Sequence, residues 1–250
     1  MKLLIDVGNT RLKWAALEAG RLGARGAVTH RGAAPAEWLA PLDAAAGRPD
    51  AILVANVAGP AVAHSIGEWA LERHGLRPRF LKASARAGGV TNAYEHPDAL
   101  GVDRWLGLVG AWRRVGSPLV CIAAGTAFTV DAVDGSGRHL GGLIAPGYQL
   151  MIETLLKRTS DIAPGLARGP AAADGLFGRN TAAAVELGAL HALAALAARA
   201  VEAAAGRCGA APRVFLGGGD AARLAPHLGR PAEIAPDLVL EGLAVMAGED

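Results

Sequence analysis

The sequence is poor in cysteine and in clustered charge. Its 250 residues include two cysteines, Cys121 and Cys208, whose separation gives no CxxC pair. This usage excludes a disulfide framework and a cysteine-ligated zinc site, and it is typical of a reducing compartment, so we expect a cytoplasmic protein. The formal net charge is only +2, and no run of lysine and arginine is long enough to predict a nucleic-acid partner. An anionic ligand must therefore be bound by a local site.

Long apolar runs are scarce too. The first one is broken at Asp6, too early for the hydrophobic region of a signal peptide, and we expect no later run to span a bilayer or to bind a membrane. Hydrophobic residues nevertheless make up 52% of the chain and charged residues 19%. A chain of this length and composition buries one large core or two smaller ones. We therefore expect a soluble, folded protein.

Two stretches of the chain share one pattern. Residues 2–17 (KLLIDVGNTRLKWAAL) and 121–134 (CIAAGTAFTVDAVD) each place a short turn with glycine and threonine between two apolar runs. Apolar runs joined by such a turn predict a β-hairpin. We therefore expect two hairpins of the same design.

The segments that follow the hairpins are also similar. A buried strand is predicted over 52–54 with a helix through 62–71, and a strand over 214–216 precedes three glycines and another helix. The order hairpin, strand, helix thus occurs twice, which indicates an internal duplication. We predict an α/β fold of two domains with mixed sheets, residues 1–115 and 116–250, facing each other across a cleft that admits a nucleotide polyphosphate.

Three further helices are predicted from start and stop signals. One begins near Asp98 and ends by Gly116, one follows a strand at Pro146–Gly147, and a long alanine-rich one begins near Asn180. The first of these helices carries Asp103 and Arg104 in its first turns.

The first hairpin tip has the residue types that a bound phosphate needs. Asp6, Asn9, Thr10 and Lys13 supply a carboxylate, hydrogen-bonding groups and a compact positive charge. Asp6 is suited to hold Mg²⁺, directly or through water. The alternative is that Asp6 and Asn9 only cap the turn. The second hairpin and the glycine run at 217–219, whose amides are able to approach a phosphate, favour the phosphate site.

Six motifs together carry a resemblance to a known family. They are DVGNTRLK (6–13), NAYEHPDALGVDRW (92–105), GTAFTVDAVD (125–134), GGLIAPG (141–147), GRNTAAAVELG (178–188) and LGGGDAARL (216–224). In their order and spacing the chain resembles the type III pantothenate kinases, which belong to the superfamily of actin-like and hexokinase-like ATPases. The resemblance covers nearly the whole chain. It implies two duplicated actin-like (ribonuclease H-like) domains that face an ATP cleft. It also implies transfer of the ATP γ-phosphate to pantothenate, giving 4'-phosphopantothenate in the first step of coenzyme A biosynthesis.

The resemblance also implies the roles of the Gly-x-Asp-Arg element at 101–104. Asp103 would act as the catalytic base and Arg104 would position the acceptor. Phosphoryl transfer requires alignment, charge neutralisation and a carboxylate to orient the attacking hydroxyl, so the role suits an aspartate. The alternative is a solvated ion pair in the first turn of a helix.

Two sets of binding residues follow from the same resemblance. The acceptor set comprises Tyr94, Gly101, Val102, Asp103, Arg104 and Thr181. The ATP and phosphate set comprises Asp6, Val7, Gly8, Asn9, Thr10, Arg11, Leu12, Lys13, Gly125, Thr126, Gly218 and Gly219. Structural alternatives stay open for Tyr94 as a packed loop residue, Thr181 as a helix start, Thr126 as a strand residue and the glycines as a plain turn. The histidines His96, His139 and His191 show no ligand spacing, and we interpret them as surface or core residues.

One position departs from the family pattern. Aligning Gly8 with Gly125 sets Asp6 opposite Ala123, where family members commonly carry an aspartate associated with a monovalent cation. Alanine offers a cation no ligand. We therefore expect Mg²⁺ to be served by Asp6, with Asp131 or water, and activation by K⁺ or NH₄⁺ to be weak or absent.

The sequence leaves two other functions open and implies a partner. A degenerate relative would bind nucleotide as an accessory or regulatory protein, and a kinase of the same superfamily would use a sugar or acetate as acceptor. The presence of Asp6, Lys13, Asp103, Arg104 and Thr126 argues against lost catalysis. The resemblance further implies a homodimer whose partner completes the acceptor pocket. The helix over 181–205 is a candidate for that contact or, alternatively, an internal core helix.

Overall fold

The chain forms two units in the computed structural model, which describes residues 1–160, 162 and 173–249. The first unit comprises 1–117, 135–141 and 237–250, and the second comprises 118–134 and 142–236. The chain first passes from one unit to the other between residues 117 and 118, close to the predicted division of 1–115 and 116–250. The division differs from that prediction in two segments, 135–141 and 237–250, which belong to the first unit.

The first unit is built on a five-stranded mixed sheet with the order β3-β2-β1-β4-β5. Its strands are β1 (Lys2–Val7), β2 (Arg11–Glu18), β3 (Arg21–Thr29), β4 (Ala51–Asn56) and β5 (Arg79–Phe80). β1 pairs with β2 and β2 with β3 in antiparallel fashion, whereas β1 with β4 and β4 with β5 are parallel. The predicted first hairpin and the strand after it are therefore confirmed.

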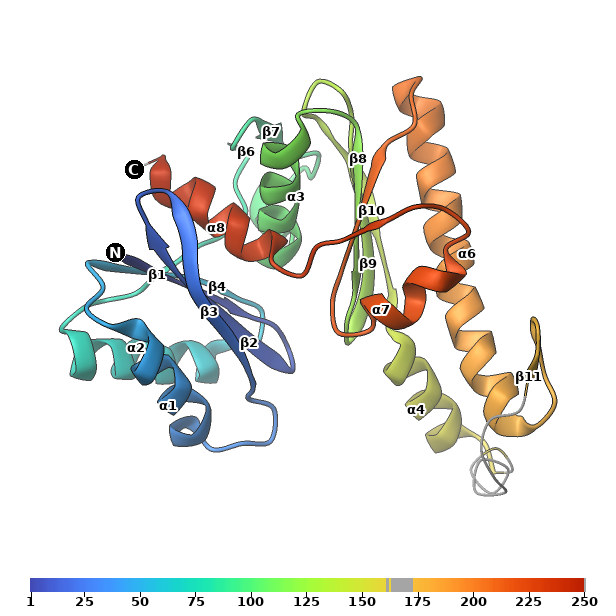
Figure 1. Ribbon diagram of the computed structural model, residues 1–250, viewed down its shortest axis with the longest axis horizontal. Coiled ribbons are helices and arrows are strands. Elements are labelled where there is room, and N and C mark those ends of the chain that lie inside the picture. Colours follow the sequence, from blue (N-terminus) through green and yellow to red (C-terminus); the bar gives the residue numbers. More distant parts are fainter. Residues whose placement is uncertain (161, 163–172, 250) are drawn as a thin grey trace. The chain divides into compact units, whose positions relative to one another are not determined.

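Helices cover both faces of this sheet (Figure 1). The helices of the first unit are α1 (Pro35–Ala46), α2 (Pro60–His74), η1 (Pro97–Ala99), α3 (Val102–Val115) and α8 (Leu238–Gly248). A small hairpin is formed by β6 (Arg86–Ala87) and β7 (Val90–Thr91). On one face, side chains of β1 and β2 such as Leu3, Ile5 and Leu12 pack with Trp38 of α1 and Trp69 of α2. On the other face lies α8.

The C-terminal helix belongs to the first unit because it packs tightly on α3. A side chain at Gly242 would collide with the main chain of Leu106, and one at Gly110 would collide with the main chain at Leu238. Burial between two such close helices ties residues 237–250 to the first sheet rather than to the second.

The helix predicted from near Asp98 begins later. Residues 97–99 form the separate turn η1, and Leu100 is extended with a ψ of 132°. Gly101 is the N-cap of α3, so Asp103 lies in the first turn of the helix. The predicted end at Gly116, which is left-handed, is confirmed.

The second unit repeats the first sheet with the order β10-β9-β8-β13-β14. Its strands are β8 (Leu119–Ala124), β9 (Ala127–Val133), β10 (His139–Pro146), β13 (Arg213–Gly217) and β14 (Glu233–Ile234), and β11 (Ala173–Asp174) pairs with β12 (Phe177–Gly178). β8 and β9 are antiparallel, whereas β8 with β13 and β13 with β14 are parallel. The same strand order in both sheets, with the same directions in these three pairs as in their counterparts of the first sheet, confirms the predicted duplication.

The helices of the second unit are α4 (Tyr148–Arg158), α6 (Thr181–Cys208), α7 (Ala221–Leu224) and η2 (Ala225–His227). The N-cap of α6 is Asn180, whose side-chain oxygen accepts a hydrogen bond of 2.9 Å from the Ala183 amide, as its sequence position predicts. Apolar residues of α4 and α6 pack on Ile122 and Val130 of the sheet. The helix predicted after the glycine run is only the short α7 and the turn η2.

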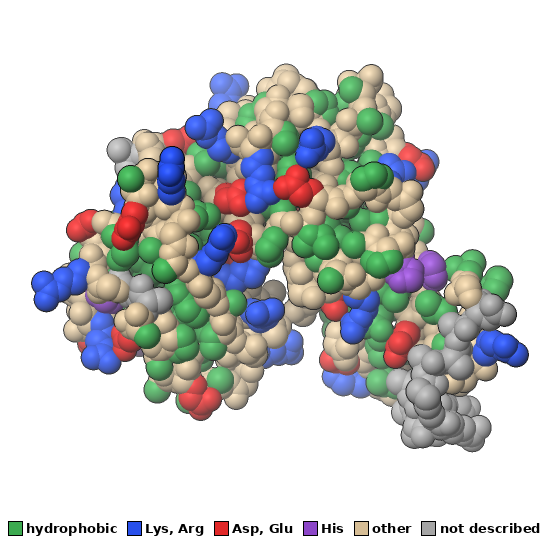
Figure 2. All heavy atoms as spheres, viewed as in Figure 1, with side chains coloured by type: hydrophobic (Ala, Val, Ile, Leu, Met, Phe, Trp, Pro, Cys, Tyr) green, Lys and Arg blue, Asp and Glu red, His purple; other side chains and the backbone are tan. Residues whose placement is uncertain are grey.

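Within the described residues, α6 alone has the length and composition to span a bilayer, so the expectation that no run does so is wrong by that criterion. Core helices of globular proteins meet the same criterion. One face of α6, with buried residues spaced from Val185 to Ala204, packs in the core of the second unit. On the face shown in Figure 2, basic and acidic side chains are interspersed, in keeping with a net charge of +2.

Candidate active site

The tip of the first hairpin presents a carboxylate beside a lysine. Asp6 lies directly opposite Lys13 in the antiparallel register, so both side chains point to the same face of the sheet. The amide of Gly8 donates a hydrogen bond of 3.0 Å to the carbonyl of Arg11 and closes the turn. Asn9 and Arg11 are exposed at the tip. The geometry is open to an anion on the tip side.

The pKa of Asp6 is raised to about 7, chiefly by desolvation, and Lys13 opposes this rise. The charges of Asp103 and Asp237 raise it further. The first unit therefore brings together Asp6 and Asp103, both predicted as site residues, although they are far apart in the sequence. Asp237 is a neighbour that the sequence analysis missed.

Asp237 is the N-cap residue of α8 and forms an ion pair of 2.7 Å with Arg25. An aspartate directly before an apolar helical run is a signal that would have marked it as a helix start. No sequence signal places it near Asp6, because that proximity depends on the packing of α8.

The Gly-x-Asp-Arg element folds around the carboxylate of Asp103. Its Oδ1 accepts a hydrogen bond of 2.8 Å from the amide of Arg104. A side chain at Gly101 would lie 2.8 Å from the same oxygen, so only glycine leaves the carboxylate this position. Val102 is buried and anchors the turn.

Arg104 and Tyr94, two residues of the predicted acceptor set, contact each other in the first unit. The Nη1 of Arg104 donates to the Tyr94 hydroxyl at 3.1 Å, and the guanidinium carbon lies 5.8 Å from the centre of the tyrosine ring. The amide of Tyr94 donates to Asn92 at 3.0 Å. The ring of His139 stacks on Tyr94 at 6.0 Å with an interplanar angle of 16°. His139 is a core residue, one of the two alternatives we kept, and it contacts the predicted site.

In the second unit, two loops converge on the tip of the second hairpin. The amide of Gly147 donates to the carbonyl of Thr126 at 3.0 Å, and that of Asp220 donates to the carbonyl of Ala124 at 3.0 Å. Gly218 has a φ of 94° and lies so close to Ala124 that a side chain would collide with its main chain. The structure thus brings Gly125, Thr126, Gly218 and Gly219 into one loop cluster.

An arginine borders this loop cluster that the sequence analysis did not single out. The guanidinium carbon of Arg223, on α7, lies 4.5 Å from the centre of the Tyr148 ring. Arg223 also pairs with Asp220 at 3.2 Å. Burial raises the pKa of the Tyr148 hydroxyl, and the charge of Glu186 adds to this rise.

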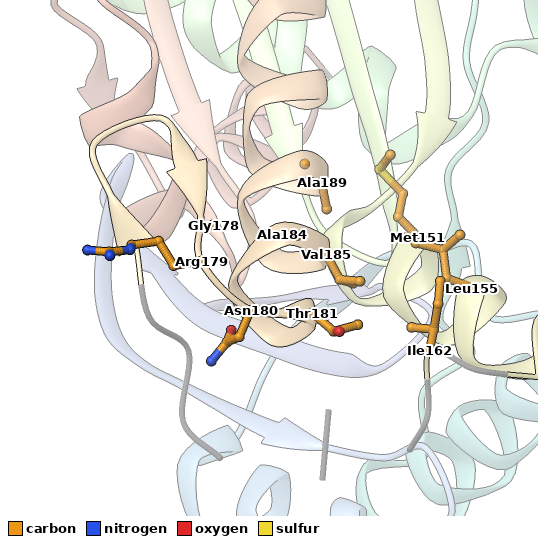
Figure 3. Close-up of a pocket in the computed structure, with 11 residues that line it drawn as sticks. Met151, Leu155, Ile162, Gly178, Arg179, Asn180, Thr181, Ala184, Val185 and Ala189 are labelled. Carbon is orange, nitrogen blue, oxygen red and sulfur yellow. The ribbon is translucent and has the colours of Figure 1, made fainter. Parts of the chain in front are cut away.

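Thr181 lies elsewhere in the second unit. It lines a pocket of about 590 Å³ between α4 and α6, together with Met151, Leu155, Ile162, Gly178, Arg179, Asn180, Ala184, Val185, Gly188 and Ala189. Figure 3 shows Met151, Leu155 and Ile162 facing α6, whereas Arg179 points away from them. Neither Thr126 nor Gly218 lines this pocket, so Thr181 is not part of the loop cluster.

The residue opposite Asp6 in the duplication offers no side-chain ligand to a cation. Ala123 pairs with Thr129, and Asp131 pairs with Cys121 two residues further along the strand. Asp131 is buried, with 2% of its surface exposed. Within the described ranges, no three side chains of histidine, cysteine, aspartate or glutamate are grouped as metal ligands.

Solved structures of similar architecture define the fold. One is a Sinorhizobium meliloti protein assigned as a 2-dehydro-3-deoxygalactonokinase. It is similar over 100% of this chain and 99% of its own, with a TM-score of 0.62 and 16% identity. The activator of the 2-hydroxyisocaproyl-CoA dehydratase from Clostridium difficile, solved with bound ADPNP, is similar over 99% of this chain and 94% of its own, with a TM-score of 0.54 and 12% identity. The two mixed sheets are therefore those of the actin-like ATPase fold, as predicted.

Sequence comparison defines the family within that fold. The sequence model of the type III pantothenate kinases matches residues 2–203. A protein of that name from Nitrosococcus oceani is 37% identical over 252 residues, covering 99% of this chain and 94% of its own length. Another from Thiobacillus denitrificans is 40% identical over 249 residues, covering 98% and 96%. The chain belongs to the type III pantothenate kinase family.

Proposed function

We propose that the protein transfers the γ-phosphate of ATP to pantothenate and so forms 4'-phosphopantothenate, the first step of coenzyme A biosynthesis. Membership of the type III pantothenate kinase family supports this activity. The observation that carries it is the meeting, in one unit, of the Asp6–Lys13 hairpin with Asp103 at the start of α3. Phosphoryl transfer needs a cation beside the phosphate and a carboxylate that accepts the proton of the attacking hydroxyl. This arrangement has both.

Each residue has a role that its chemistry supports. Lys13 and the amides of the hairpin tip bind the phosphates, and Asp103 orients the acceptor hydroxyl and accepts its proton. Pantothenate carries a carboxylate, for which Arg104 is the complementary cation and the Tyr94 hydroxyl a further hydrogen-bonding group. The loop cluster around Thr126 and Gly218 contacts the nucleotide, because its glycines allow the main chain to approach a ligand closely.

Asp6 fits a bound Mg²⁺. Its carboxylate is destabilised by desolvation and by two other acids, and a divalent cation would relieve both effects. Mg²⁺ is commonly held by one or two carboxylates, water and substrate phosphates, so a large protein ligand set is not needed. When bound, the ion neutralises charge that develops on the phosphates. Asp131 fits this role poorly because only 2% of its surface is exposed, whereas Asp6 is partly exposed and so accessible to the ion.

We propose that the protein needs no monovalent cation. Ala123 lacks a side-chain oxygen, and its cross-strand neighbour Thr129 is 9% exposed. A K⁺ or NH₄⁺ ion is bound by several oxygen atoms, and neither side chain of this pair contributes a carboxylate.

We further propose a cytoplasmic homodimer in which the second copy covers the pocket around Thr181. The resemblance in the sequence and the apolar side chains exposed near this pocket support the contact. Leu155 is 39% exposed on α4, and Leu176 and Phe177 are 55% and 75% exposed beside the start of α6. The cysteine usage supports the location.

A panel of acceptors tests the proposed function. Purified protein is incubated with Mg·ATP and pantothenate, an N-acetylated hexosamine, glucose or acetate, and the products are identified by mass spectrometry. Phosphopantothenate as the main product supports the proposal. A phosphorylated sugar or acetyl phosphate in its place would assign another acceptor, and nucleotide binding without any product would indicate an accessory protein.

A further inference from the structure

A buried histidine that no sequence motif singles out lies against the first hairpin tip. His30 follows the last residue of β3 and is 7% exposed. Its Nε2 lies 2.7 Å from the carbonyl oxygen of Gly8, 22 residues earlier in the chain. A carbonyl only accepts hydrogen bonds, so Nε2 carries the proton and donates it. The side chain is therefore a fixed donor to the tip of the hairpin.

We propose that His30 is a positioning residue for the nucleotide, because it sets the orientation of the Gly8–Asn9 peptide. This inference rests on the proposed function and deepens it on the nucleotide side.

The orientation follows from peptide geometry. In a trans peptide the carbonyl and the next amide point in opposite directions, and the described chain contains no cis bond. The Gly8 carbonyl points to His30, so the amide of Asn9 points away from it. Asn9 is exposed at the tip, where the phosphates are proposed to bind. The hydrogen bond to His30 thus directs a backbone donor toward an anion.

The main chain of His30 binds a second carbonyl of the tip in the same way. Its amide donates a hydrogen bond of 3.1 Å to the carbonyl of Thr10. Carbonyl oxygens near a phosphate would repel it, and residue 30 draws the carbonyls of both Gly8 and Thr10 to itself. Two carbonyls of the tip are thus bound by residue 30 and not directed at the phosphate.

Packing holds the imidazole in place. Its ring meets the ring of Trp38, on α1, edge to face at 6.0 Å and 66°. Trp38 is itself buried, with 3% of its surface exposed. The carbonyl of His30 accepts a hydrogen bond of 3.2 Å from Ala33, which fixes its main chain. A ring held at these points cannot readily turn away from Gly8.

Two substitutions separate the hydrogen bond from the packing. His30→Phe keeps a ring against Trp38 but removes the donor, whereas His30→Gln replaces the donor with an amide of similar reach. Binding of Mg·AMP-PNP is measured by calorimetry, and KM is measured for ATP and for pantothenate. His64→Phe, at an exposed site on α2, is the matched control.

We expect His30→Phe to raise the Kd for Mg·AMP-PNP and the KM for ATP about five- to tenfold, the usual effect of one hydrogen bond. The KM for pantothenate should stay unchanged. His30→Gln should remain within about twofold of wild type on all three constants, because it restores the donor.

Several results would overturn the inference. One is an equal effect of His30→Phe and His30→Gln, and another is a parallel rise in both KM values. If His30→Phe does not fold, His30→Met is measured in its place. If neither variant folds but His30→Gln does, the hydrogen bond from His30 to Gly8 serves only the stability of the fold, and the inference is wrong. Wild-type protein that binds AMP-PNP but makes no phosphopantothenate overturns the proposed function and leaves the binding comparison intact. Wild-type protein that binds no nucleotide overturns both.

Discussion

Asp6 lies in surroundings that oppose its charge. Desolvation, together with Asp103 and Asp237, raises its pKa to about 7, from 3.8 in an unperturbed side chain. Between these two values the folded state retains a proton that the unfolded state has lost, so the free energy of unfolding falls as the pH rises. Below the lower value Asp6 is protonated in both the folded and the unfolded state. Above the higher value Asp6 is charged in both states, and the folded state carries the full free-energy cost of that charge.

This leads to a prediction for the protein without Mg²⁺ and nucleotide. At pH 8, Asp6→Asn should be more stable than wild type by about 2–4 kcal/mol, since each pKa unit corresponds to about 1.4 kcal/mol. At pH 4 the two should be nearly equal. Urea unfolding at both pH values measures this, with Asp98→Asn at an exposed position as the control. Equal stability of wild type and Asp6→Asn at pH 8 would contradict the raised pKa.

Ala123 leads to a prediction about monovalent cations. Because it has no oxygen ligand, the rate should change less than about twofold when K⁺ replaces Na⁺ at constant ionic strength. Ala123→Asp should create a response to K⁺ by restoring a carboxylate beside Thr129. A steady-state assay across a potassium titration measures both. Strong activation of wild-type protein by K⁺ would show that other groups form the cation site.

At the scale of elements, the link between β9 and β10 belongs to the acceptor side. Residues 135–141 leave the second unit and pack in the first, where the amide of Thr91 donates to the carbonyl of Gly137 at 2.9 Å. Thr91 also forms an isolated bridge with Arg138. This docking buries His139 beneath Tyr94, the tyrosine that accepts a hydrogen bond from Arg104.

We therefore expect His139 to influence the acceptor and not the nucleotide. His139→Leu should raise the KM for pantothenate roughly three- to tenfold, the range expected for one stacked aromatic pair, while the KM for ATP stays unchanged. His139→Phe, which keeps a planar ring, should restore the wild-type value. Steady-state kinetics with each substrate varied in turn makes the comparison. Equal KM values for the leucine and phenylalanine variants would refute the stacking role.

Local patterns were sufficient for the elements that carry most of the site. Both hairpins, α2 and α6 follow from alternation, helical spacing and the cap at Asn180, all of which are properties of neighbouring residues. β3 was not predicted, because its residues RLGARGAVT are largely exposed and show no apolar alternation. The strand exists because it pairs with β2. Its formation brings His30 to the hairpin tip.

The unpredicted contacts of the site depend on packing between distant segments. Asp237 approaches Asp6 only because α8 returns to the first sheet, and the glycines that allow this carry no local signal of their partner. The start of α3 was placed too early because Asp98 resembles a helix cap, whereas Leu100 is extended. The site assignments of Tyr94, Thr126 and Thr181 remain predictions, although the structure places each in a loop or pocket with suitable neighbours.

For the whole molecule, the proposed homodimer makes its own prediction. Phe177 is 75% exposed on β12, beside the pocket that Thr181 lines, and a second copy would cover it. Light scattering should give the mass of two chains for wild type and a mass closer to one for Phe177→Asp, because a buried charge opposes association. Ile234→Asp, at a position on β14 that is 52% exposed, is the control and should stay dimeric. A monomeric wild-type protein would contradict the proposal.

The central claim is that Asp103 accepts the proton of the pantothenate hydroxyl during transfer from ATP. The most direct test is the rate of phosphopantothenate formation by wild type and Asp103→Asn with saturating Mg·ATP, with Asp98→Asn as an exposed acidic control in the same segment. The account predicts product from wild type and from the control, and a fall in kcat of about 10²- to 10⁴-fold for Asp103→Asn with little change in the KM for ATP. A folded Asp103→Asn protein that keeps the wild-type rate would contradict it.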